Sequence, residues 1–114
     1  GLGAVTPVGN NVSETWNSLK NGKNGIAPIT FFDTEGFKAK LAAEVKGFDP
    51  KEYLEVNEIL RTDRYAQLAV AAAAQAVEDS GIEGKVEPEK FGVMFGTGIV
   101  KARFSLLFKP LQKQ

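Results

Sequence analysis

The chain has 114 residues with 43% hydrophobic content, and its 14 basic residues balance its 14 acidic ones, a composition typical of an ordinary soluble globular domain. It contains no cysteine and no histidine, which excludes disulfides and thiol nucleophiles and removes the commonest general base and metal ligand. No apolar run reaches the roughly 18 residues of a membrane-spanning helix, and no signal peptide is evident. We therefore expect a cytoplasmic protein, with no electrostatic sign of a nucleic-acid binder.

The charge is unevenly distributed along the chain. Residues 1–100 carry 10 basic and 14 acidic side chains, a net charge of −4, whereas residues 101–114 carry four basic side chains and no acidic one. This basic tail differs in kind from the sequence before it.

The first part of the chain predicts a loop, a helix and an irregular segment. Residues 1–11, GLGAVTPVGNN, have the Gly, Pro and Asn content of a loop that follows a strand. Asn11 can cap a helix that stops at Asn21-Gly22, with Glu14 reaching back to the cap and with Val12, Trp16 and Leu19 on one face. The segment 23–50 shows no sustained helical period, and we expect one short strand at residues 40–45.

A long helix is predicted to end at Gly81, because apolar residues recur at helical spacing from Tyr65 to Val77. Its packing face is mostly alanine, so we expect a buried helix that a neighbouring backbone approaches closely. The charged residues Arg61, Asp63 and Arg64 are expected at its start. The alanines of this face are Ala69, Ala72, Ala73 and Ala76.

The run GVMF at residues 92–95 is typical of a buried parallel strand, and GTGI after it of the loop that leaves the strand. This order of elements favours an α/β sheet with both glycine-rich loops, residues 1–9 and 96–99, beyond the carboxyl ends of its strands. The aromatic residues are expected in the core, since no basic residues are interleaved with them. They are Phe31, Phe32, Phe37, Phe48, Tyr65, Phe91 and Phe95.

Common ligand motifs are absent. GLGAVT lacks the third glycine of a dinucleotide-binding loop, and GTGIVK lacks the Gly-Lys-Ser/Thr ending of a phosphate-binding loop. A metal site would have only carboxylates to use, and these are spaced like solvated surface pairs.

Four blocks of the sequence together resemble one family: GLGAVTPVGNNVSETWNSLKNGKNGIAPITFFDT, AAEVKGFDPKEYL, TDRYAQLAVAAAAQAVEDSG and FGVMFGTGI. They are similar to the N-terminal part of the β-ketoacyl-acyl-carrier-protein synthases, and most of all to the type II synthase of bacterial fatty-acid elongation. The resemblance is collinear over residues 1–99, which we expect to be a partial N-terminal synthase domain. The tail, residues 100–114, is not matched, and the expected first strand is absent. We therefore interpret the chain as a fragment.

The resemblance implies an α/β fold of the thiolase-like type, with α-β-α-β-α layers, in a homodimer. It also implies decarboxylative Claisen condensation of an acyl group with malonyl-acyl carrier protein, without a cofactor and without a metal. The family uses a cysteine and two histidines, whereas this chain contains neither residue type. We therefore expect the chain to be inactive alone.

The resemblance implies non-catalytic roles for two residues of this chain. Ile99 matches a position that lines the acyl-chain pocket, and Arg61 matches a basic position that docks the acidic acyl carrier protein. At Asn57 and Leu60 the family often has basic residues, so this chain departs from the pattern there. Two alternatives stay open: a non-catalytic chain-length partner subunit of a polyketide-type synthase, and an unrelated small α/β binding domain.

Overall fold

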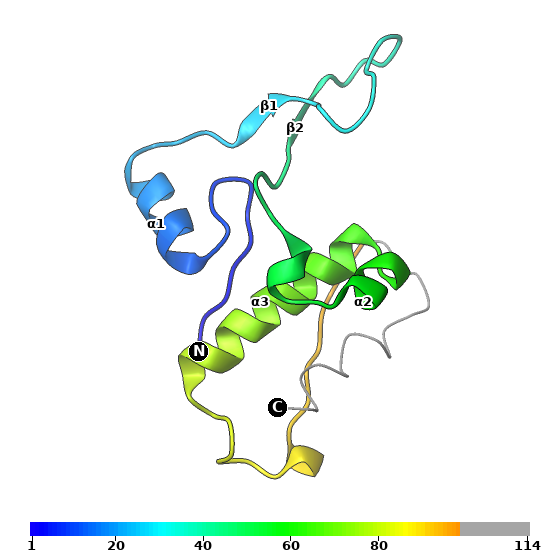
Figure 1. Ribbon diagram of the computed structural model, residues 1–114. Helices are drawn as coiled ribbons and strands as arrows, with labels where there is room; N and C mark the ends of the chain where they lie inside the picture. The colour runs from blue at the N-terminus through cyan, green and yellow to red at the C-terminus, as the bar shows by residue number, and fades with distance from the viewer. Residues whose placement is uncertain (99–114) are drawn as a thin grey trace. The chain divides into compact units, whose positions relative to one another are not determined.

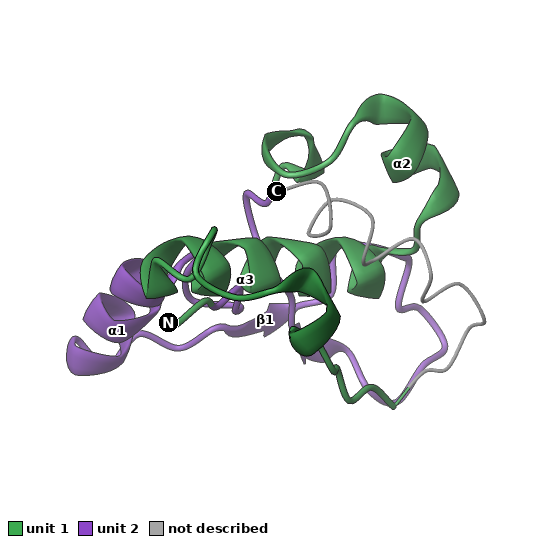
Figure 2. Ribbon diagram, turned by 90° about the horizontal axis from the view of Figure 1, so that it is seen from below, with its two compact units in different colours: residues 1–3, 49–114 green, residues 4–48 purple. Residues whose placement is uncertain are grey.

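The computed structural model describes residues 1–98, which belong to two compact units (Figures 1 and 2). One unit combines Gly1–Gly3 with the chain from Asp49 onward, and the other comprises Ala4–Phe48. Within residues 1–98, no helix has both the length and the apolar character needed to cross a membrane.

The unit Ala4–Phe48 opens with a turn and the helix α1, Val12–Lys20. The side chain of Asn11 accepts a hydrogen bond of 2.8 Å from the backbone N–H of Glu14, and the helix ends at Asn21. Gly22 follows with φ of 67°, a left-handed conformation that glycine adopts without steric cost. The predicted helix, its cap and its stop are therefore confirmed.

The inner face of α1 is polar, unlike the apolar face that the sequence predicts. Trp16 and Leu19 are 61% and 58% exposed. Instead, the hydroxyl of Ser18 donates to the carbonyl of Val8 at 2.7 Å, and the hydroxyl of Thr15 lies 3.0 Å from that of Thr6. Hydrogen bonds from the outgoing helix to the incoming loop hold this part of the unit together.

Two short strands form an antiparallel pair, β1 (Ile26–Pro28) and β2 (Leu41–Ala43), with Ile26 opposite Ala43. The strand predicted at residues 40–45 is β2. β1 was not predicted, because Pro28 suggests an interruption in this segment. Proline is nevertheless tolerated at the edge of a sheet, where its missing N–H is not needed. Beyond the strands, Glu44 accepts hydrogen bonds from the N–H and the hydroxyl of Thr30 at 3.1 and 3.0 Å.

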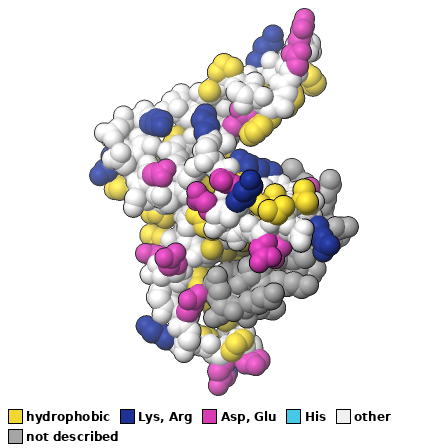
Figure 3. All heavy atoms as spheres, viewed as in Figure 1, with side chains coloured by type: hydrophobic (Ala, Val, Ile, Leu, Met, Phe, Trp, Pro, Cys, Tyr) yellow, Lys and Arg dark blue, Asp and Glu magenta, His cyan; other side chains and the backbone are white. Residues whose placement is uncertain are grey.

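The prediction of an aromatic core is wrong for this unit. Phe31, Phe32 and Phe37 are 55–67% exposed, although the rings of Phe32 and Phe37 meet edge to face at 5.8 Å. Figure 3 shows hydrophobic side chains at the surface along the β1–β2 hairpin. Every buried residue among those described belongs to the other unit.

That unit is helical. It contains α2 (Val56–Arg61) and α3 (Arg64–Ser80), with the short 3-10 turns η1 (Pro50–Glu52) and η2 (Pro88–Lys90). Gly81 ends α3 with φ of 63°, as predicted. The core is formed by Leu54, Ala66 and Val70, against which Tyr53, Ile59, Tyr65 and Ala69 pack.

The alanine-rich helix α3 is confirmed, with a shifted inner face. Its buried residues include Ala71 and Ala73, whereas Ala69, Ala72 and Ala76 are half-buried. The predicted close approach of a backbone is present on the alanine side: a Cβ added to Gly1 or Gly3 would overlap the carbonyl oxygen of Ala76 or Ala72 respectively. The N–H of Leu2 donates to the Asp79 carboxylate at 2.8 Å and fixes this segment along the helix.

Two other expectations need correction. Residues 92–95 are not a strand, and Met94 is 96% exposed. A strand needs a partner for its backbone groups, and within residues 1–98 the only named strands are β1 and β2, which pair with each other and are antiparallel. Arg61 is the last residue of α2 rather than part of the start of α3, because the chain is extended at Thr62 and Asp63.

Gly3→Ala should destabilise the helical unit, because its new methyl group would meet the backbone of α3, which cannot move aside as a side chain can. Overpacking of this kind costs about 1–3 kcal/mol. Urea unfolding followed by far-UV circular dichroism measures the effect. Gly92→Ala is the matched control, since a Cβ there meets nothing within 4 Å and its φ is not positive. Equal midpoints for the two variants would contradict the proposed packing.

Candidate functional site

The strongest candidate site is the exposed side of α2, which we call the α2 surface and define by Val56, Asn57, Leu60 and Arg61. Val56 and Leu60 lie one helical turn apart and are 61% and 80% exposed. Asn57 and Arg61 are also exposed and lie one turn apart. Two apolar side chains thus lie beside an amide and a cation, a combination suited to protein recognition.

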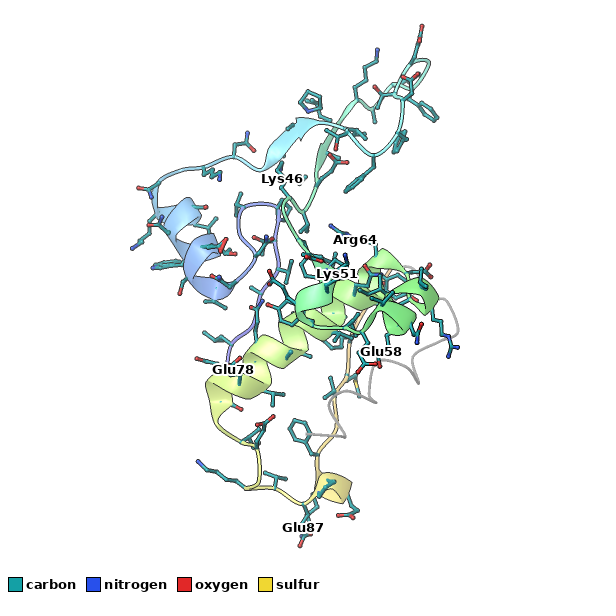
Figure 4. The ribbon with its side chains drawn as sticks, in the orientation of Figure 1. Lys46, Lys51, Glu58, Arg64, Glu78 and Glu87 are labelled. Carbon is teal, nitrogen blue, oxygen red and sulfur yellow. The ribbon has the colours of Figure 1, made fainter. Side chains whose placement is uncertain are left out.

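Arg61 is the cation of this surface, at the C-terminal end of α2, where a positive charge also complements the helix dipole. Within residues 1–98 its guanidinium makes no ion pair or hydrogen bond, and the only salt bridge there joins Lys90 to Glu87 at 3.3 Å. Figure 3 shows hydrophobic and basic side chains at the surface around α2, and Figure 4 shows Glu58 on the same helix. An acidic partner could therefore reach this guanidinium without displacing an internal ion pair.

A buried glutamine fixes the end of α2. Gln67, on the first turn of α3, is 7% exposed. Its side-chain amide donates to the carbonyls of Ile59 and Thr62 and to the Thr62 hydroxyl, each at 3.3 Å. The Thr62 hydroxyl in turn donates to the carbonyl of Glu58 at 2.8 Å. Gln67 therefore satisfies backbone acceptors at the connection that sets the direction of α2 relative to α3.

The sequence reasoning did not identify Gln67. Its position supplies a usable signal: in TDRYAQLAV a glutamine lies beside Ala66 and one turn before Val70 and Ala71, within a stripe that is otherwise apolar. A polar residue on such a stripe needs internal partners, because burying an amide without hydrogen bonds is costly. The carbonyls at a nearby helix end are suitable partners.

The start of α2 is also well defined. The carboxylate of Glu58 accepts a hydrogen bond of 3.2 Å from the N–H of Glu55, the residue before the helix. The turn η1 contacts both α2 and α3, and the hydroxyl of Tyr53 accepts from the Gln75 amide of α3 at 3.0 Å. Helix α2 is thus connected to α3 at both ends, through η1 before it and through Gln67 after it.

The other predicted site residue, Ile99, lies outside the described residues, so the structure does not bring it together with Arg61. Among residues 1–98, no cluster of three or more carboxylates could hold a metal ion. With no cysteine or histidine anywhere in the sequence, the α2 surface presents apolar, amide and cationic side chains but no thiol and no imidazole.

Comparison with known proteins gives a clear family. The sequence model of the β-ketoacyl synthase N-terminal domain matches residues 1–112. Over 100 residues, which are 87% of this chain, the identity is 46% to the 3-oxoacyl-[acyl-carrier-protein] synthase 2 of Coxiella burnetii, 41% to that of Synechocystis and 39% to that of Staphylococcus aureus. The chain spans about a quarter of the length of these relatives, 24–25%.

A solved structure agrees. A chain of the ishigamide ketosynthase/chain length factor matches 75% of this chain, with 38% sequence identity and a TM-score of 0.64, and the match covers 21% of that protein chain. The fold is therefore of the thiolase-like α/β class. The chain belongs to the β-ketoacyl synthase family and matches its N-terminal domain. This result confirms the resemblance drawn from the sequence and excludes an unrelated small α/β domain.

Gln67→Leu should destabilise the helical unit by about 1–3 kcal/mol, because it removes the amide donor of the Thr62 carbonyl and one of the donors of the Ile59 carbonyl. The change keeps the side chain close in size, so lost hydrogen bonds rather than lost volume decide the outcome. Urea unfolding followed by circular dichroism measures it. Asn57→Ala, on the exposed side of α2, is the control and should change stability by less than about 0.5 kcal/mol. An unchanged midpoint for Gln67→Leu would show that the glutamine does not support α2.

Proposed function

We propose that this chain forms the N-terminal part of a β-ketoacyl-acyl-carrier-protein synthase of type II, a transferase of fatty-acid biosynthesis. The observation that carries the proposal is the match over 100 residues, at 39–46% identity, to proteins named 3-oxoacyl-[acyl-carrier-protein] synthase 2. The match includes the family's own N-terminal domain rather than only a general α/β fold.

The reaction joins an acyl group to a malonyl group held on acyl carrier protein. A thiolate displaces the carrier from the acyl thioester; malonyl-carrier protein then loses carbon dioxide, and the resulting carbanion attacks the enzyme-bound thioester and releases the thiolate. The cysteine and the two histidines for these steps must come from sequence beyond this chain, which has none. Within the proposal, the complete enzyme is a cytoplasmic homodimer with the α-β-α-β-α layers of the family, and it needs no cofactor.

The α2 surface is our proposed docking site for acyl carrier protein. Acyl carrier protein is acidic, and Arg61 offers an exposed cation without an internal partner among residues 1–98. The departures from the family at Asn57 and Leu60 replace positive charge by an amide and an exposed apolar side chain. We infer that docking here depends on one charge supported by apolar contact from Leu60 and Val56.

Ile99 is proposed as a wall residue of the acyl-chain pocket, on the basis of the GTGI sequence in which it stands. We also propose that the part of the chain typical of the synthases ends at Ile99. The family model is aligned with residues 1–112 and so includes most of the tail as well.

The alternative is a chain-length partner subunit, which keeps the fold and lacks the catalytic cysteine. One observation favours it: the matched structure is named a ketosynthase/chain length factor. The names of the more similar relatives favour the condensing enzyme. The residue at the cysteine position of the complete protein separates the two functions, since only the enzyme has a thiol there.

A chimera tests the main proposal. The matching 100 residues of the Coxiella burnetii relative are replaced by those of this chain, and condensation is assayed with acyl- and malonyl-acyl carrier protein. We expect a rate within about tenfold of the parent, a change in activation free energy of about 1.4 kcal/mol or less. The 114-residue chain alone should give no product. A chimera that folds and binds acyl carrier protein but does not condense would contradict the proposed function.

Arg61→Glu in that chimera tests the docking site. Exposed ion pairs contribute about 0.2–1 kcal/mol, so reversing the charge should raise the KM for acyl carrier protein about three- to tenfold, with kcat little changed. The effect should shrink as salt concentration rises. Lys85→Glu is the matched charge reversal, at an exposed turn after α3. If both variants raise KM equally, net charge rather than the α2 surface governs docking.

A further inference from the structure

The unit Ala4–Phe48 contains two Asn-Gly pairs within five residues, Asn21-Gly22 and Asn24-Gly25. In such a pair the backbone nitrogen of glycine can attack the asparagine side-chain carbonyl, because glycine has no side chain to obstruct the approach. Both asparagines are exposed to water. By sequence alone the two pairs are equivalent, so the structure around each decides its reactivity.

Asn21 is held away from this reaction. Its side-chain amide turns back along α1 and donates to the carbonyl of Asn17 at 2.8 Å. The attacking nitrogen is also engaged, because the N–H of Gly22 donates to the carbonyl of Leu19 at 3.1 Å. Attack would break both hydrogen bonds and open the C-terminal end of the helix.

Asn24 has the opposite arrangement. Its side-chain oxygen accepts a hydrogen bond of 2.9 Å from the N–H of Ile26, two residues later, so the side chain folds over the peptide group that contains the Gly25 nitrogen. The donor also withdraws electron density from the carbonyl that would be attacked. Within residues 1–98, the N–H of Gly25 makes no hydrogen bond that attack would have to break.

Lys46 adds a positive charge at this position. Its ammonium group donates to the carbonyl of Gly25 and to that of Glu44, both at 3.1 Å. The reaction begins when the N–H of Gly25 loses its proton, and a cation nearby stabilises the negative charge that develops on the nitrogen. Among residues 1–98, no lysine ammonium group donates to the carbonyl of Gly22 in the same way.

We propose that Asn24 is a site of spontaneous deamidation and isoaspartate formation, whereas Asn21 is protected. Hydroxide takes the proton from the N–H of Gly25, and the nitrogen forms a bond to the side-chain carbon of Asn24. The bond from that carbon to the amide nitrogen then breaks, and the amide nitrogen takes a proton from water and leaves as ammonia. Water then opens the cyclic imide to give aspartate or isoaspartate. Water is the only co-reactant, and nothing is oxidised or reduced.

The product changes the entry to β1. Isoaspartate adds one carbon to the main chain immediately before Gly25 and Ile26 and introduces a negative charge within the same turn. The acceptor that now fixes the N–H of Ile26 is displaced, and the new carboxylate can pair with Lys46 instead. Deamidation would thus alter the local geometry at the start of the β1–β2 hairpin.

Peptide mapping of the intact 114-residue protein tests the proposal. The protein is incubated at mildly alkaline pH, then digested, and each Asn-Gly peptide is followed by the mass gain of amide-to-acid conversion. Isoaspartate is detected with an L-isoaspartyl methyltransferase and labelled S-adenosylmethionine. We expect Asn24 to convert at least about fivefold faster than Asn21, the factor that corresponds to one hydrogen bond of about 1 kcal/mol.

Two controls accompany this measurement. In concentrated urea the two sites should convert at similar rates, because the local surroundings are then lost. Asn24→Ser keeps an oxygen acceptor for the N–H of Ile26 and should abolish both the mass gain and the methyl labelling of that peptide. Faster conversion at Asn21, equal rates in the native protein, or no conversion at Asn24 would each overturn the proposal.

Discussion

The close approach of Gly1–Gly3 to α3 is the constraint on which the helical unit depends. α3 offers alanine side chains at this contact, and the facing segment offers glycines, so two backbones meet where side chains would ordinarily separate them. The N–H of Leu2 and the carboxylate of Asp79 fix the contact along the helix. Because the surfaces in contact are backbone, they have little freedom to adjust, and a single added methyl group has no space.

The N-terminal end of α3, opposite this contact, supports the candidate site on α2. Gln67 reaches from the first turn of α3 to the last carbonyls of α2 and to Thr62. The exposed residues of the α2 surface contribute little to the core, so their orientation depends on this glutamine and on the turn η1. The orientation of the α2 surface is therefore coupled to the packing of α3 through hydrogen bonds to the end of α2 and through the contact of Ile59 with the core.

Features decided by neighbouring residues could be predicted from the sequence. Asn11 and Asn21-Gly22 bound α1, and Gly81 ends α3, because caps act over a few residues. Features decided by distant partners could not. The run at residues 92–95 has the composition of a buried strand, but strand formation requires a neighbouring strand, and Met94 is almost fully exposed. The aromatic residues of the β1–β2 hairpin were wrongly predicted in the core for the same reason, since burial of an aromatic ring depends on packing partners that are distant in the sequence.

The candidate site also contains one residue that could be identified from the sequence and one that could not. The family resemblance identified Arg61, and the structure places it at the exposed C-terminal end of α2. Gln67 has no family motif and was found only through its buried hydrogen bonds. A charged docking residue can be replaced at small cost, since it contributes about 1 kcal/mol or less, whereas a buried polar residue leaves unpaired acceptors when it is removed. In the proposed docking role, the amide and the leucine at positions 57 and 60 therefore alter the exposed contact surface of α2 without removing the hydrogen bonds of Gln67 that support the helix.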